Sequence, residues 1–152
     1  MPAAQEGKTT KTLMIVEDEA MVAMVLRDEL QDAGYKVLDL TDRQDEALQV
    51  AAAEKPDLAL VNIALAGDDD GIELSEHLKA LGIPVLLISG QSSRASSAKT
   101  VAIGSMPKPY NAAEMVEAVA YLLARLNGDG SLPKPTQLEV FDDSCFDGVP
   151  DT

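Results

Sequence analysis

Five polar side chains in this sequence stand where short apolar segments end. Glu17 and Asp18 directly follow one such segment, and Asn62, Ser89 and Lys108 stand at or just after the ends of three later ones. Each is weak evidence alone, because acids after a strand are usually solvated loop residues. In a parallel sheet, however, all five side chains meet at one edge, where open α/β folds bind ligands. The spacing therefore predicts one polar ligand site.

The elements that must position these residues are strands alternating with amphipathic helices. The predicted strands cover residues 12–16, 36–40, 58–64, 84–89 and 105–106. The predicted helices cover residues 19–33, 45–55, 72–81 and 112–126. This alternation predicts an α/β, flavodoxin-like, doubly wound sheet of five parallel strands in the order 2-1-3-4-5, with helices on both faces. Its ligand crevice lies at the carboxyl ends of strands one and three.

Composition limits the function classes that the chain can serve. The 152 residues are 46% apolar, enough for one domain with a core, and the net charge of -14 disfavours direct binding to DNA or to an anionic membrane. No apolar run approaches the roughly 20 residues needed to span a bilayer. The lone Cys145 has no partner for a disulfide. We therefore expect a cytoplasmic protein whose partners are other proteins.

Three regions follow from the same patterns: a flexible N-terminus over residues 1–11, a folded domain over 12–126 and an acidic tail over 127–152. An apolar island, residues 138–141, interrupts the tail. The simpler interpretation is a disordered tail with an incidental apolar patch. The alternative is that the island docks on its own domain or on a partner as an added strand.

Four motifs carry a family resemblance that covers about residues 11–126. They are IVEDE at 15–19, PDLALVN at 56–62, IPVLLISG at 83–90 and KPY at 108–110. In this order and spacing, the chain resembles the receiver domains of two-component response regulators. The resemblance implies Mg²⁺-dependent phosphoryl transfer from a histidine kinase or a histidine phosphotransfer protein to an aspartate at position 62. It also implies a signalling protein that catalyses its own dephosphorylation, not an enzyme with a separate substrate.

The resemblance also implies a set of metal ligands. Asp18 would bind Mg²⁺ directly, Glu17 would hold it through water, and the side chain at position 62 and the carbonyl of Ala64 would supply further oxygens. Mg²⁺ prefers oxygen ligands and keeps several waters, so these residue types suit it. The alternative for Glu17 and Asp18 is a pair of acids that caps the following helix.

The phosphoryl group has its own implied partners. Ser89 would donate a hydrogen bond to a phosphoryl oxygen, and Lys108 would pair with its charge. The bond between Lys108 and Pro109 resembles the cis peptide of the family. The acidic run at residues 68–70 is interpreted as a loop that starts a helix, with a role around the metal as the alternative.

The chain departs from the family at Asn62, where an aspartate is expected. An amide is too poor a nucleophile to accept a phosphoryl group, so we expect no phosphorylation and weakened Mg²⁺ binding. Either an engineered Asp→Asn change or a natural loss of phosphorylation explains this residue. Because the other site residues are all present, we favour a working site in which the aspartate has been substituted.

A second departure is Ser105, where the family usually has an aromatic residue that turns inward on activation. We expect a different switch, and the serine-rich residues 90–100, whose helical pattern is weak and which we expect to be mobile, are the candidate.

Two functions remain open. The first is a stand-alone receiver: no DNA-binding pattern follows Leu126, so its output should run through contacts with an unknown downstream protein. A homodimer through the last predicted helix is compatible with the resemblance. The alternative is a pseudo-receiver, a binding module that works without phosphorylation.

Overall fold

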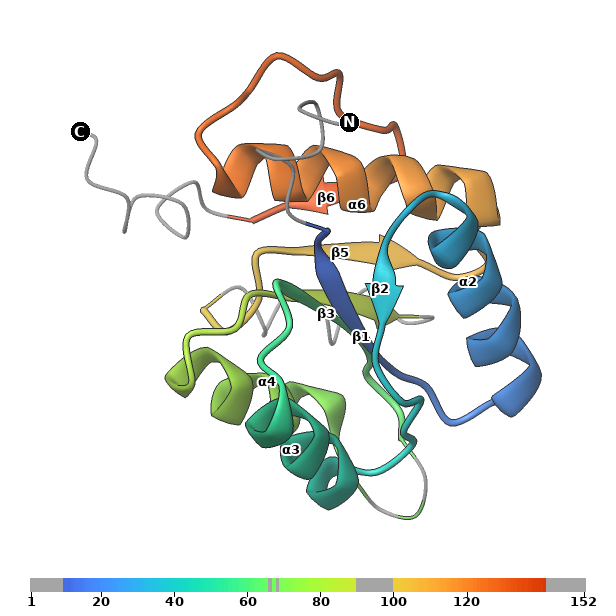
Figure 1. Ribbon diagram of the computed structural model, residues 1–152, viewed down its shortest axis with the longest axis vertical. Helices are drawn as coiled ribbons and strands as arrows, with labels where there is room; N and C mark the ends of the chain where they lie inside the picture. Colours follow the sequence, from blue (N-terminus) through green and yellow to red (C-terminus); the bar gives the residue numbers. More distant parts are fainter. Residues whose placement is uncertain (1–9, 66, 68, 90–99, 142–152) are drawn as a thin grey trace, which may run out of the picture.

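A six-stranded sheet forms the centre of the computed structural model, which describes residues 10–65, 67, 69–89 and 100–141 (Figure 1). The strand order is β2-β1-β3-β4-β5-β6. The first five strands are parallel, and β6 runs antiparallel to β5. The strands are β1 (Thr12–Val16), β2 (Lys36–Val37), β3 (Leu58–Asn62), β4 (Val85–Ser89), β5 (Gly104–Pro107) and β6 (Glu139–Val140). The predicted five-stranded order is confirmed, and a sixth strand extends it.

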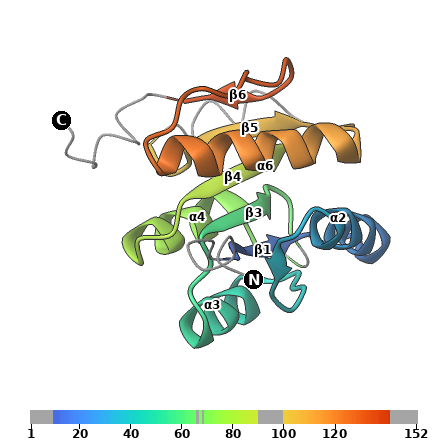
Figure 2. The same cartoon turned by 45° about the horizontal axis from the view of Figure 1, so that its top comes forward.

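Helices cover both faces of the sheet, as predicted. One core lies under α2 (Ala20–Asp32) and α6 (Ala112–Leu126), and the other under α3 (Gln44–Ala53) and α4 (Gly71–Ala80). Figure 2 shows α6 on the opposite side of the sheet from α3 and α4. Strands β1, β3 and β4 are buried along their whole length, because side chains on both of their faces enter a core.

Local chemistry explains several of the boundaries. Helix α2 ends where Gly34 adopts a φ of 101°, a left-handed conformation that costs glycine little. Helix α6 begins at Asn111, whose side chain accepts hydrogen bonds from the backbone of the first turn. The second predicted strand is too long, because only Lys36 and Val37 pair with β1 as a regular ladder.

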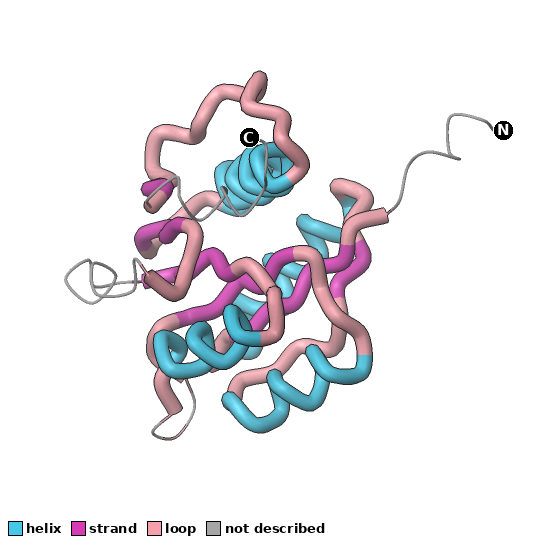
Figure 3. The backbone as a smooth tube through the Cα atoms, turned by 90° about the vertical axis from the view of Figure 1, so that its left-hand side faces the viewer, coloured by secondary structure: helices cyan, strands magenta, loops and turns pink. Residues whose placement is uncertain are grey.

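The tail supplies the sixth strand. Of the two interpretations of residues 138–141, the structure shows the docked one: β6 pairs with β5, and Leu138 and Phe141 are 1% and 4% exposed. In Figure 3 the loop after α6 runs over that helix and returns to the sheet edge. Sequence composition alone favours a disordered tail. Composition cannot show that the edge of β5 is able to pair with a two-residue strand.

Some expectations lie outside the described residues. These are the behaviour of residues 1–9, the switch proposed for residues 90–99, and the state of Cys145. Among the helices of the described residues, none combines the length and the apolarity that crossing a membrane requires.

Candidate functional site

The predicted site residues stand at one end of the sheet. Glu17 and Asp18 follow β1, Asn62 ends β3, Ser89 ends β4, and Lys108 follows β5. Because β1, β3, β4 and β5 are parallel neighbours in register, their carboxyl ends bring these residues to the same edge.

The side chain of Asn62 lies at the centre of this arrangement. Its Nδ2 atom donates to the carbonyl oxygen of Ala64 at 2.6 Å and to Asp18 Oδ1 at 3.0 Å, and it lies 3.5 Å from Glu17 Oε2. Three oxygens, two from the adjacent acids Glu17 and Asp18 and one from Ala64, thus surround one nitrogen atom. An amide group has only two N–H bonds, so it cannot satisfy three acceptors fully. Three oxygen atoms arranged in this way are also suited to bind a cation at the position of the amide nitrogen.

Glu17 is the most constrained acid of the site, with only 3% of its surface exposed. Burial raises the pKa of its carboxyl, and a hydrogen bond with Asp18 and the charge of Asp18 raise it further. The backbone N–H of Glu19 donates to Glu17 Oε2 at 3.1 Å, and Lys108 Nζ lies 3.4 Å from Oε1; both contacts oppose that rise. Oε1 is buried and has no hydrogen-bond partner among the described residues, so it can accept a further ligand.

Glu17 and Asp18 are neither the N-cap nor first-turn acids of helix α2, although Glu17 accepts the backbone N–H of the N-cap residue Glu19. Helix α2 begins after Glu19, which makes no side-chain capping bond, and its first turn contains no acid. Both carboxylates instead point toward the end of β3, where they meet Asn62.

Ser89 and Lys108 are linked through the backbone. The Lys108 N–H donates to the carbonyl of Ser89 at 2.9 Å, and the Lys108–Pro109 bond is cis, as the family resemblance implies. Ser89 is buried, and it comes one residue after Ile88, which is the β4 partner of Asn62. The hydroxyl and the ammonium group therefore belong to the same end of the sheet as the acids.

The acidic loop after β3 caps two helices. Asp70 is the N-cap of α4 and accepts from the Ile72 N–H at 2.9 Å. Asp69 reaches further and accepts from the Gln44 N–H at 2.8 Å, at the start of α3. The loop-and-helix-start interpretation is confirmed for Asp70, whereas the bond from Asp69 to another helix was not predicted.

Thr41 is a neighbour of the site that sequence reasoning missed. Its carbonyl accepts from the Glu17 N–H at 3.0 Å, and its own N–H donates to the Ile15 carbonyl. The Thr41 hydroxyl is buried and has no hydrogen-bond partner in the described part of the chain. The available signal was its position one residue after the second predicted strand, at the same sheet edge.

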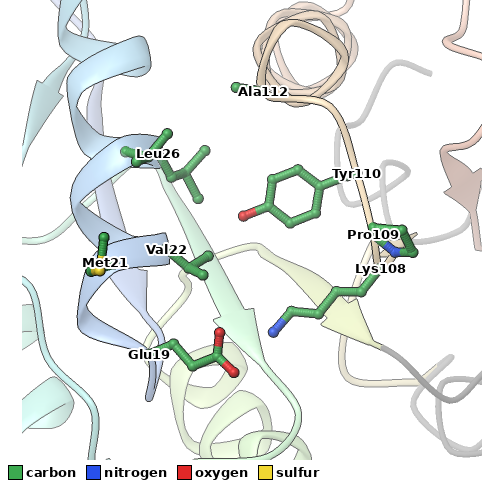
Figure 4. A pocket seen from close by; sticks show the side chains of 9 residues that line it. Glu19, Met21, Val22, Leu26, Lys108, Pro109, Tyr110 and Ala112 are labelled. Carbon is green, nitrogen blue, oxygen red and sulfur yellow. The ribbon is translucent and has the colours of Figure 1, made fainter.

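An apolar groove of about 640 Å³ lies beside the site, between α2 and the segment that follows β5 (Figure 4). Met21 and Val25 of α2 are 79% and 55% exposed along it. Tyr110 closes the other side, and Lys108 and Glu19 point toward each other at one end. Burial, together with the charge of Glu17, raises the pKa of Tyr110 to about 12.

The chain is similar in sequence to known proteins. Residues 13–120 match the response regulator receiver domain. The chain is 30% identical over 146 residues to the uncharacterized transcriptional regulatory protein YbdJ of Bacillus subtilis, covering 90% of this chain and 64% of YbdJ. It is also 30% identical over 131 residues to the phosphate regulon regulator PhoB of Pseudomonas aeruginosa, covering 81% and 56%. The chain thus spans less than two thirds of the length of these relatives.

Solved structures give the same result. The signal receiver domain of a modulated diguanylate cyclase from Desulfovibrio desulfuricans superposes with a TM-score of 0.69 at 31% identity, over 77% of this chain and 96% of that domain. A CheY-like receiver domain protein from Methanospirillum hungatei gives 0.67 at 26% identity, over 76% and 94%. The chain belongs to the response regulator receiver domain family.

Proposed function

We propose that the site is a phosphoryl-acceptor site of a two-component pathway and that Asn62 keeps it from reacting. The observation that carries the proposal is the convergence of Glu17, Asp18 and the Ala64 carbonyl on the side chain at position 62. With an aspartate there, a carboxylate would stand beside oxygen ligands for a metal, a buried serine and a lysine. An asparagine supplies no nucleophile for phosphorus.

The donor set fits Mg²⁺. Carboxylates and a backbone carbonyl are the oxygen ligands that Mg²⁺ uses in proteins, and Glu17 Oε1 is a buried acceptor that lacks a hydrogen bond among the described residues. We propose that Asp18 and the Ala64 carbonyl hold the ion and that Glu17 contributes through water. A bound Mg²⁺ would neutralise charge on the oxygens of a phosphoryl group.

Asn62 competes with such an ion. Its N–H group donates to the same oxygens that would bind the metal, and an N–H group cannot itself be a ligand. Mg²⁺ binding to this chain must therefore break these hydrogen bonds, which weakens its affinity.

Lys108 and Ser89 complete the proposed site. Lys108 Nζ is held near the acids by its ion pair with Glu17, so a phosphoryl group at position 62 would find a positive charge beside it. Ser89 ends the strand adjacent to β3 and is proposed to donate its hydroxyl hydrogen to a phosphoryl oxygen.

We propose that the phosphoryl donor is a histidine kinase or a histidine phosphotransfer protein and that it docks over the apolar groove. The exposed side chains of Met21 and Val25 on α2 line the groove, and so does Lys108. A partner bound in the groove would therefore be close to the site. The output should also be a protein contact, because a net charge of -14 opposes direct DNA binding. We propose that this contact is made in the cytoplasm. The two relatives above are named as transcriptional regulators, but the chain covers only part of each.

One observation favours the second candidate, a pseudo-receiver that binds partners without phosphorylation. The Asn62 amide already supplies the acids with a hydrogen-bond donor, so the site is stabilised without a metal. In that case the surface around α2 would bind its partner in a single, permanent conformation.

Intact mass after incubation with Mg²⁺ and acetyl phosphate distinguishes the two candidates. We expect the unmodified chain to gain no phosphoryl mass and Asn62→Asp to gain one, which Asp18→Asn in the same background abolishes. If Asn62→Asp, correctly folded by circular dichroism, gains no mass, the acceptor-site proposal is wrong and the pseudo-receiver replaces it.

A further inference from the structure

A cleft of about 340 Å³ lies between α2 and the segment that joins β2 to α3. Helix α2 lines it with a stripe of residues at helical spacing, Ala20, Ala23, Met24 and Arg27. The apolar groove uses other residues of the same helix, so the two cavities lie on different faces of α2. Residues 40–42, Glu46 of α3 and the two acids that follow β1 form the rest of the wall.

Negative charge dominates the wall of this cleft. Its lining contains four acids, Glu17, Asp18, Asp42 and Glu46, against one base, Arg27, which leaves a formal charge of -3. Lys108 offsets part of the charge of Glu17. The contact of Asp42 with Arg43 is exposed and long, at 3.9 Å, so it offsets little. The cleft therefore attracts cations.

Two buried oxygen atoms of the lining residues have no hydrogen bond within the described part of the chain. Thr41 is only 8% exposed, and its hydroxyl is one of them. Glu17 is 3% exposed, and its Oε1 atom is the other. Buried polar atoms nearly always find a partner, which can be a ligand. A ligand that donates hydrogen bonds inside the cleft would supply it.

The wall suits an organic cation better than a metal ion. Among the described residues, no three His, Cys, Asp or Glu side chains converge closely enough to hold a metal. A guanidinium group is wider and has five N–H donors in one plane, so it can reach acceptors that stand apart. Ala20 and Ala23 are small and Met24 is 46% exposed, which leaves an apolar surface for a methylene chain.

We propose that this cleft binds the guanidinium group of an arginine side chain of a partner protein. Asp42 and Glu46 attract the charge, the Thr41 hydroxyl accepts a hydrogen bond, and Met24 packs against the methylene groups. Free arginine carries an α-carboxylate that the acidic wall repels, so a side chain within a protein fits better than the free amino acid. The proposal is independent of phosphoryl transfer at position 62.

Blocked arginine, N-acetyl-arginine amide, is the probe for the first test. It is titrated into the full chain without Mg²⁺, and nuclear magnetic resonance follows the amides of residues 20–27 and 40–46. We expect saturable shifts in these segments. N-acetyl-citrulline amide has the same shape without the charge and should cause none. Equal binding of the citrulline compound, or no saturable shift with the arginine compound, would overturn the proposal. Tighter binding of free arginine would overturn the assignment to a partner protein.

Charge variants test whether the cleft itself binds the probe. Asp42→Asn combined with Glu46→Gln should weaken the affinity at least about threefold. The control, Glu29→Gln combined with Asp32→Asn, removes the same charge from exposed positions of α2 outside the lining and should change the affinity little. Arg27→Gln should tighten binding, because it removes the like charge of the wall. Equal affinities of the two double variants would overturn the proposal.

Thr41 separates binding from stability. Thr41→Val replaces the hydroxyl with a methyl group and breaks no side-chain hydrogen bond of the described residues, so the free energy of unfolding should not fall. The affinity for the probe should fall about fivefold. Thr41→Ser retains the hydroxyl and should bind as the unmodified chain does. An unchanged affinity in a folded Thr41→Val would overturn the proposed mode of binding.

Discussion

The carboxyl end of the sheet and the outer edge of β5 are stabilised in opposite ways. At the carboxyl end, Glu17 is buried beside Asp18, and one lysine lies close enough to offset their charge. At the β5 edge, Leu138 and Phe141 bury apolar side chains in the two cores. The first region keeps polar groups together at an electrostatic cost, whereas the second gains stability from apolar burial together with backbone pairing to β5.

This difference separates function from folding within one small domain. Acids that repel each other remain adjacent where a ligand can relieve the repulsion, and in this chain the Asn62 amide relieves part of it. The edge shows no such conflict, because Leu138 and Phe141 are apolar and buried there and β6 pairs with β5. Substitutions at the edge should therefore lower the free energy of unfolding. Substitutions at the site should be able to lower it or raise it.

The largest expected effect is at the edge. Leu138→Ala removes a fully buried side chain and should lower the free energy of unfolding by about 3 kcal/mol. Leu132→Ala, at an exposed position of the same loop, should change it little. Urea denaturation of both variants measures the difference. Equal stabilities would mean that residues 138–141 do not contribute to folding.

The next effect is at the site. Without metal, Asn62→Asp removes the amide hydrogen bonds and adds a third carboxylate, which should lower the free energy of unfolding by roughly 2 kcal/mol. Mg²⁺ should restore part of this loss. Asn111→Asp is the control, because aspartate also caps helix α6. Melting curves of Asn62→Asp that do not respond to Mg²⁺ would contradict the proposed acidic site.

A smaller effect tests the loop that joins the site to two helices. Asp69→Ala removes the bond to the start of α3 and should cost about 1 kcal/mol, as for other N-terminal caps. Asp69→Asn keeps an acceptor oxygen and should retain most of the stability. Thermal unfolding of the pair checks this, and identical losses in both variants would argue against the capping role.

The smallest effect concerns Tyr110 and appears only at high pH. Its pKa is raised from 10.0 to about 12, so the folded state retains a proton that the unfolded chain releases first. The free energy of unfolding should therefore fall as the pH rises between these values. In Tyr110→Phe, ultraviolet titration should lack the last tyrosine step. Persistence of that step would assign it to another residue.

The site could be predicted from sequence because its positions follow continuous apolar runs. Residues 58–64 and 84–89 read as strands, and the ends of parallel strands bring Asn62 and Ser89 to one edge without any detail of packing. The arrangement of hydrogen bonds could not be predicted in the same way. The bond from Asp69 to Gln44 joins residues 25 apart, and nothing local to either residue indicates it.

The sixth strand shows the other limit of sequence reasoning. Two paired residues carry no alternation that distinguishes a strand from a loop, and the acidic composition around them favours disorder. Its burial depends on Gly104, more than thirty residues earlier, which lacks the side chain that would exclude it. Likewise, the shortening of β2 reflects its pairing with β1 and not its own apolar pattern.

The most direct test of the central claim, that the Asn62 amide lies where a cation would bind, is the Mg²⁺ affinity measured by calorimetry. We predict that Asn62→Asp binds Mg²⁺ at least roughly tenfold more tightly than the unmodified chain, because a competing N–H donor becomes a charged ligand. Equal affinities for the two proteins, or no binding to either, would contradict the claim.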